Sequence, residues 1–111
     1  MAGVLVAISI PIFTSQLEKS REAVDLANLR TAYAECTTAV LTGEADTDNK
    51  VEKGDTEGSY KKTVTLVQKK KNWTGDNANA KIGGQDLPAI TTDGQASVTI
   101  TVASNGKISW S

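Results

Sequence analysis

Cys36 is the strongest nucleophile that this sequence of 111 residues offers. A catalytic cysteine needs a neighbouring base, most often histidine, and the chain contains no histidine. Cys36 also falls at helical spacing among apolar residues, where a cysteine behaves as a small hydrophobic side chain. We interpret it as a core residue. Since the sequence also lacks a nucleophile–base pair and a phosphate-binding glycine loop, we expect no enzyme and no small-molecule substrate.

Oxygen ligands that could hold calcium gather in the run EADTDN, at Glu44, Asp46, Asp48 and Asn49. The run has neither the glycine nor the closing glutamate of a helix–loop–helix calcium site. We favour a solvated loop, and expect no metal and no cofactor. Three further aspartates lie on separate loop segments with no partner base at a useful spacing: Asp76, Asp86 and Asp93.

The run KKKNW places Lys69, Lys70 and Lys71 beside Trp73. Such a cluster could contact a DNA backbone and stack a base. Three lysines are a modest cluster, and lysines also protect the edge of a sheet against aggregation. We favour the structural interpretation and keep DNA as a weakly supported partner.

Length and charge narrow the function classes further. The length predicts one small domain. The formal net charge is −1, from 12 basic and 13 acidic residues, so no long-range field attracts nucleic acid or an anionic membrane. With one cysteine, the fold must hold without an internal disulfide.

The elements that position these residues begin with the run GVLVAISIPIF, residues 3–13, which is apolar apart from Ser9. It is about half of the roughly 20 residues that a membrane-spanning helix needs. It also lacks the basic region and the cleavage motif of a secretory signal. We expect that the chain has been cut inside a longer apolar helix.

The helix is predicted to continue to residue 41. Apolar residues recur at spacings of three and four on one face and form the predicted core of the head: Leu26, Leu29, Tyr33, Cys36 and Val40. Gly43 is well placed to end the helix. A helix of residues 3–41 would be about 55 to 60 Å long, too long for the rest of the chain to cover. We therefore predict a protruding part, residues 1–25, and a globular head, residues 26–111.

Strand patterns follow a polar connector, residues 44–59. The runs YKKTVTLVQ and SVTITV alternate, and KISW is joined to the latter by the turn ASNG. The segment between the first strand and the last two is rich in loop residues, and Ile82 or residues 87–90 could add a short edge piece. The predicted fold class is α+β: a long N-terminal helix packed on a three- or four-stranded antiparallel meander.

The first third of the chain resembles the N-terminal helix of a type IV pilin. The resemblance rests on the apolar run with a small residue before Pro11, on the proline itself, and on the switch to a charged amphipathic helix that leads into a meander. The basic leader, the methylated phenylalanine and the nearby glutamate of the family would lie before Gly3. The chain also lacks the C-terminal cysteine pair of many Gram-negative pilins, so a disulfide-free pilin or a related pseudopilin fits better.

The resemblance implies a structural subunit of a type IV pilus, a cell-surface filament that serves adhesion, motility or uptake. The subunit would be anchored in the cytoplasmic membrane before assembly, and would then join other copies and other pilins in a helical filament. The alternative is a pseudopilin of a type II secretion or competence machine. A third possibility, a DNA-binding or adhesive module on a helical stalk, would depend on the lysine cluster.

Within this frame, the filament core or membrane contact is assigned to Val4, Leu5, Ile8, Ile10, Pro11, Ile12 and Phe13. A proline inside an apolar helix costs about 3 kcal/mol in water but is tolerated among membrane helices. In pilins this region bends or partly unwinds on assembly. The alternative is a helix that begins at Pro11 after a disordered tail. Charge pairs between subunits are assigned to Glu18, Lys19, Arg21 and Glu22.

Overall fold

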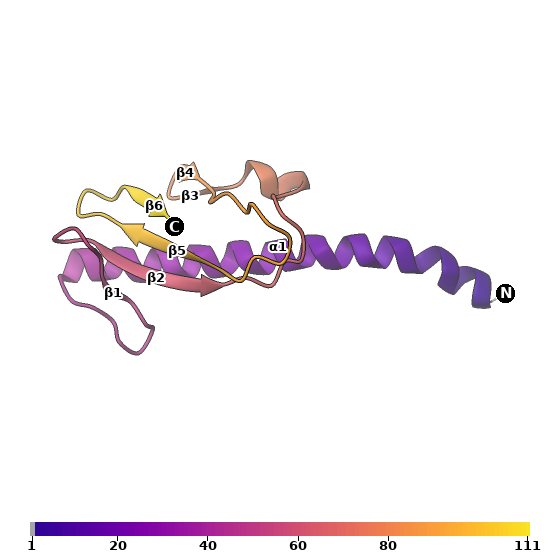
Figure 1. The fold of residues 1–111 in the computed structure, drawn as a ribbon, viewed down its shortest axis with the longest axis horizontal. Coiled ribbons are helices and arrows are strands. Elements are labelled where there is room, and N and C mark those ends of the chain that lie inside the picture. Colours follow the sequence, from indigo (N-terminus) through magenta and orange to yellow (C-terminus); the bar gives the residue numbers. More distant parts are fainter. Residues whose placement is uncertain (1) are drawn as a thin grey trace.

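The structure, a computed structural model, describes the backbone of residues 2–111 and the side chains from Gln16 onward. One long helix, α1 (Ala2–Thr42), is followed by strands that lie along its second half (Figure 1). The elements after it, in chain order, are β1 (Glu52–Lys53), β2 (Tyr60–Thr65), the 3-10 helix η1 (Gly75–Asn79), β3 (Lys81–Ile82), β4 (Gln85–Asp86), β5 (Ser97–Val102) and β6 (Ile108–Trp110). The predicted α+β class, a long N-terminal helix on an antiparallel sheet, is confirmed.

The main sheet has four antiparallel strands in the order β1-β2-β5-β6. The two longest strands pair from Tyr60 opposite Val102 to Thr65 opposite Ser97. The fourth strand differs from the prediction. Ile82 belongs to a separate hairpin of β3 and β4, whereas the main sheet gains β1 from the segment predicted to be an exposed connector. Residues 87–90 form no strand.

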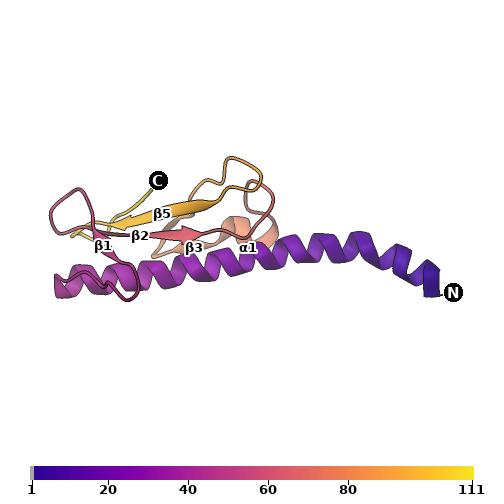
Figure 2. The ribbon, with the colours of Figure 1, turned by 60° about the horizontal axis from the view of Figure 1, so that its bottom comes forward.

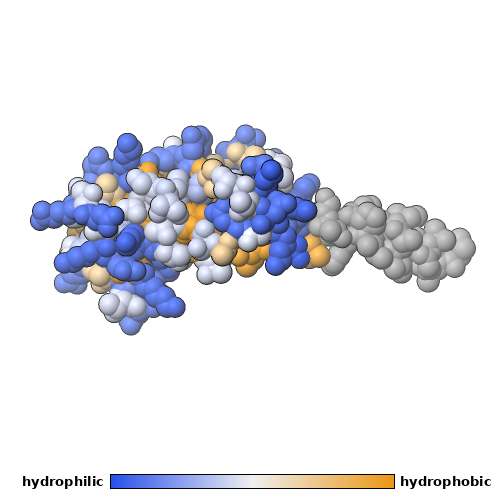
Figure 3. All heavy atoms as spheres, in the orientation of Figure 1, coloured by the Kyte–Doolittle hydropathy of each residue, from blue (hydrophilic) through white to orange (hydrophobic). Residues whose placement is uncertain are grey.

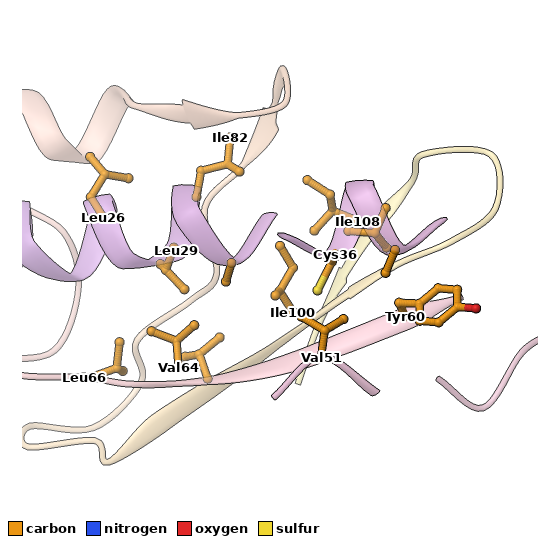
Figure 4. Close-up of a cluster of buried hydrophobic side chains, with 14 of the residues drawn as sticks. Leu26, Leu29, Cys36, Val51, Tyr60, Val64, Leu66, Ile82, Ile100 and Ile108 are labelled. Carbon is orange, nitrogen blue, oxygen red and sulfur yellow. The ribbon is translucent and has the colours of Figure 1, made fainter. Parts of the chain in front are cut away.

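The core lies between α1 and the inner face of the sheet. Alternation along β5 turns Val98, Ile100 and Val102 toward the helix, where each is at most 3% exposed. Figure 4 shows the labelled helix side chains meeting those of the strands. Buried residues from the loops and the remaining strands complete this cluster: Val51, Tyr60, Val64, Leu66, Ile82, Ile90 and Ile108.

On the helix side, the predicted core residues Leu26, Leu29 and Cys36 are buried. The structure places Tyr33 and Val40 at the margin, where they are half-buried and pack against the cluster. Ala32 and Ala39, which were not predicted, are also buried, at 0% and 2% exposed.

The turns are built by glycines with positive φ. Gly43 has φ 74° and its N–H donates to Ala39 O at 2.8 Å, which ends α1 as predicted. In the hairpin between β5 and β6, Gly106 has φ 88°, and Asn105 Oδ1 accepts the N–H of Lys107 at 3.0 Å.

The helix extends well beyond the head (Figures 1 and 2), and the principal extents are 63 × 26 × 20 Å. Position 11 lies inside α1, so the helix does not begin there. The side chains assigned to the filament core or membrane contact lie outside the described ones: Val4, Leu5, Ile8, Ile10, Pro11, Ile12 and Phe13. Within the described residues, no helix has both the length and the apolar character of a membrane span.

Candidate functional site: the helix and its junction with the head

Three carboxylates of α1, Glu18, Glu22 and Asp25, hold the segment that follows β2. Spacings of four and three place them on one face of the helix. We call residues 67–74 the junction loop. Because this irregular segment lies over a helix, its backbone N–H groups need acceptors that no strand supplies, and the carboxylates provide them.

Asp25 makes the most buried of these contacts. Its Oδ1 accepts the N–H of Val67 at 2.8 Å, and its Oδ2 accepts the N–H of Gln68 at 2.9 Å. The Asp25 residue is 0% exposed. Burial raises the pKa of its carboxyl above the ordinary value of 3.8, the two N–H donors lower it, and the charges of Glu18 and Glu22 raise it further. The net shift is upward.

The two glutamates hold the rest of the junction loop. Glu22 accepts both the backbone N–H of Thr74 at 2.7 Å and its hydroxyl at 2.8 Å. Glu18 accepts the N–H groups of Lys69 and Lys70 at 3.1 Å. The loop is therefore attached to the helix at both of its ends and in its middle.

Further hydrogen bonds fix the junction loop, some within the loop and one to Asp93. Gln68 is 2% exposed, and its Nε2 donates to Lys70 O and Asn72 O, each at 3.1 Å. Lys71 N donates to the Asp93 carboxylate at 2.8 Å. Lysine side chains 69 to 71 are exposed while their backbone is fixed.

These contacts change the role predicted for the charged residues of the helix. Glu22 is 0% exposed and is not available on the surface of the subunit, contrary to the expectation of a pair between subunits. Glu18 has a side chain that is 17% exposed, and Arg21 Nη1 lies 3.4 Å from it. Lys19 is exposed. The head thus reaches down the helix to Glu18, further than the predicted boundary at residue 26.

The missed signal was the register of the acidic residues. Glu22 lies four positions before Leu26, and Asp25 lies four positions before Leu29, so both are on the face of the helix that the core residues share. A charged residue in that register is buried unless the head ends before it. The sequence gives no sign that a loop 42 or more positions further on supplies the donors.

Among the described residues, the strands leave the opposite face of α1 uncovered (Figure 2), and the loop of residues 44–48 lies beside its last turns at Thr38 and Thr42. Eight uncharged residues recur on it at alternating spacings of three and four, and all eight are exposed; we call them the helix stripe: Leu17, Ser20, Val24, Ala27, Thr31, Ala34, Thr38 and Leu41. This spacing is the heptad pattern by which helices pack against one another. The stripe runs about 36 Å along the helix.

Two hydroxyls within the stripe are already satisfied. Thr31 Oγ1 donates to Ala27 O at 3.1 Å, and Thr38 Oγ1 donates to Ala34 O at 2.9 Å. Each threonine can therefore enter an apolar contact without leaving an unpaired donor. In the sequence, the same spacing continued toward the N-terminus falls on Val6, Ile10 and Phe13.

Cys36 is free and buried in the core. Burial raises the pKa of its thiol to about 11, and Glu35 adds to the shift. At neutral pH the group is a thiol and not a thiolate, so it is a poor nucleophile.

The acidic run after the helix folds onto itself. Asp46 accepts the backbone N–H of Asn49 at 3.2 Å and its side-chain amide at 2.8 Å, and these bonds lower the pKa of the Asp46 carboxyl. Among the described residues, no group of three or more potential metal-binding side chains comes together. Asp86 pairs with Lys81.

The lysine cluster does not lie on an edge strand, because the junction loop follows β2, an inner strand of the sheet. Trp73 is half-buried and packs against the core. Its Nε1 donates to Pro88 O at 2.9 Å. The fold therefore engages part of the ring, and only the rest of it remains exposed.

Comparison of the chain with protein-family models, with curated proteins and with solved structures returned no match.

Proposed function

We propose that this chain is a structural subunit of a type IV pilus or a closely related filament, which assembles by packing α1 against the helices of other copies. The observation that carries the proposal is the helix stripe, an exposed uncharged heptad face whose register continues into the apolar run of residues 3–13. A surface helix that stays in water usually carries charges on its exposed face. This stripe carries none.

The division between helix and head supports the same use. The head has its own core, and the junction loop fixes it to the helix from Glu18 onward. Among the described side chains, Glu18 is the first along the helix that hydrogen-bonds to the head, and the apolar run precedes it in the sequence. Before assembly, this run would be shielded by the cytoplasmic membrane, and in the filament by other helices.

A pair of matched variants tests the packing surface. Ala27→Glu and Ala34→Glu each place a charge in the helix stripe, whereas Asn28→Glu places the same charge on an exposed neighbouring position. We expect the first two to remove filaments sheared from cells while the head stays folded by circular dichroism, and the third to assemble. Normal assembly of all three would reject packing along the stripe.

Ile8→Asp makes the corresponding test of the apolar run, since a charge there should abolish assembly and leave the head folded.

Mass spectrometry of sheared filaments distinguishes a pilus subunit from the alternative, a pseudopilin. Abundant peptides of this chain would support a pilus subunit. Retention in the membrane, with none in the sheared fraction, would support a pseudopilin.

A further inference from the structure

Five cationic side chains surround the end of the head from which α1 emerges. Three lie on the junction loop and two on the helix beside it; we call them the basic rim: Lys19, Arg21, Lys69, Lys70 and Lys71. The four lysines are exposed, and the Arg21 side chain is 35% exposed. Since Glu18 accepts the N–H groups of Lys69 and Lys70, these lysines are held within one hydrogen bond of the helix.

The acidic residues at this end mostly face inward. Glu22 and Asp25 are 0% exposed and accept backbone N–H groups. Glu18 does the same, with a side chain that is 17% exposed. Two exposed carboxylates remain near the loop, Asp93, which accepts Lys71 N, and Asp76 on η1. The surface at this end therefore presents more cations than anions, although the whole chain carries a formal charge of −1.

Apolar side chains are exposed at the same end. Among the described residues, four large hydrophobic side chains are exposed, and three of them lie here: Leu17, Val24 and Val67, at 37%, 48% and 41%. Val67 is tied to the helix through Asp25. Figure 3 shows hydrophilic residues with apolar ones among them at this end of the head. Exposed apolar residues among lysines are typical of surfaces that bind a membrane interface.

The position of the rim along the helix fits such a surface. Glu18 follows Phe13, the last residue of the apolar run, by five positions, or about 7 Å of helix. The headgroup layer on each side of a bilayer is about 5 to 7 Å thick. With the apolar run in hydrocarbon, the rim would lie at the level of the lipid phosphates.

We propose that the basic rim docks the head onto anionic phospholipid headgroups while the subunit waits in the membrane, an inference that rests on the membrane stage of the proposed function. The lysine ammonium groups pair with lipid phosphates, and Leu17 and Val67 enter the interface beside them. A DNA partner fits less well, because the Trp73 ring is packed against the core and its Nε1 is used by Pro88.

Vesicle binding by the full chain tests this inference. Flotation is measured with vesicles of phosphatidylcholine alone and of phosphatidylcholine mixed with phosphatidylglycerol, at low and at physiological salt. We expect the anionic lipid to strengthen binding, and salt to weaken that gain. The triple variant Lys69→Ala, Lys70→Ala, Lys71→Ala should lose about fivefold for each lysine, or about a hundredfold in all, with the anionic vesicles.

A matched triple variant, Lys50→Ala, Lys53→Ala, Lys107→Ala, removes the same charge from exposed positions elsewhere on the head. It should keep the gain from anionic lipid. An equal loss of binding to anionic vesicles in both triple variants would overturn the proposal that the basic rim binds anionic lipid. No gain in binding with phosphatidylglycerol would do the same. So would loss of duplex DNA binding in the first variant with vesicle binding unchanged.

Binding to vesicles of phosphatidylcholine alone tests whether the apolar run anchors the chain in a membrane. Ile8→Asp should abolish binding to phosphatidylcholine, whereas the rim variant should leave it unchanged. Neutral binding that survives Ile8→Asp would count against the proposed anchoring. In that case, the basic rim would still be supported if anionic lipid strengthened binding of the wild type and not of the variant Lys69→Ala, Lys70→Ala, Lys71→Ala.

Discussion

The Asp25 carboxylate accepts the backbone N–H of Gln68 at 2.9 Å, across 43 positions of sequence and with both residues at most 2% exposed. An anion in such a site is stabilised only by the donors aimed at it. Asp25 is one of the three helix carboxylates that hold the chain after β2, and its contact with Gln68 is the most buried of theirs.

Asp25→Asn should therefore destabilise the protein. An amide keeps one acceptor but turns its NH₂ group toward one of the two N–H donors, and an unpaired buried group costs about 1–3 kcal/mol. Urea unfolding would measure the loss. Asp93→Asn is the matched control, because Asp93 also accepts a backbone N–H but is exposed, and its loss should stay below about 1 kcal/mol. Equal losses would show that burial at Asp25 is not the cause.

The same carboxyl predicts a dependence of stability on pH. Because its pKa is raised in the folded state, the folded protein binds the proton more readily than the unfolded chain does. This contribution to stability is present below the ordinary value of 3.8 and is lost as the pH rises through the higher folded-state pKa. The free energy of unfolding of the wild type minus that of Asp25→Asn should fall across this interval. Carbon-13 titration of the Asp25 carboxyl should give a midpoint above 3.8, and a midpoint below it would contradict the sign.

Two adjacent glycines between β3 and β4 should differ in their tolerance of alanine. Both have positive φ, at 57° and 75°, so both substitutions carry backbone strain of about 1 kcal/mol. A Cβ on Gly83 would lie 2.6 Å from Tyr33 Oη, whereas a Cβ on Gly84 meets no described atom within 4 Å. Gly83→Ala should cost about 1 kcal/mol more than Gly84→Ala, since the ring must move. The difference should vanish in a Tyr33→Leu background, and its persistence there would exclude the ring as the cause.

Cys36 should react slowly with thiol reagents in the native protein. The thiol is buried, and its pKa of about 11 leaves little thiolate at neutral pH. Labelling by a disulfide reagent should be rate-limited by opening of the fold, and should become fast in denaturant. Fast labelling of the native chain, with no change in circular dichroism, would contradict the burial of this residue between helix and sheet.

Periodic patterns in the sequence predicted the helix and the long strands, but they did not predict the contacts between a helix and a loop or between an inner and an edge strand. The spacing of Leu26, Leu29 and Cys36 predicted the buried face of the helix, and the alternation of SVTITV predicted β5, because each pattern repeats along one element. The strand β1 has two residues, too few for any alternation to be read, and it exists because β2 offers an edge.

The junction was missed for a different reason. Its donors are backbone N–H groups, which every residue except proline carries and which leave no mark in a sequence. Glu18 and Glu22 were expected to pair with charges on other subunits, because they lie just beyond the apolar run in the sequence. What decides their role is the course of the loop over the helix, and that course depends on the completed sheet.

The lengths of the strands have a consequence for how copies of this chain can associate. The outer strands of the sheet, β1 and β6, have two and three residues, while the inner pair have six each. Edges this short are poor templates for strand addition by a neighbour. Pairing of edge strands between copies is a route by which many β-rich chains aggregate. The short edges disfavour this pairing, so many heads can lie close together without forming a continuous sheet.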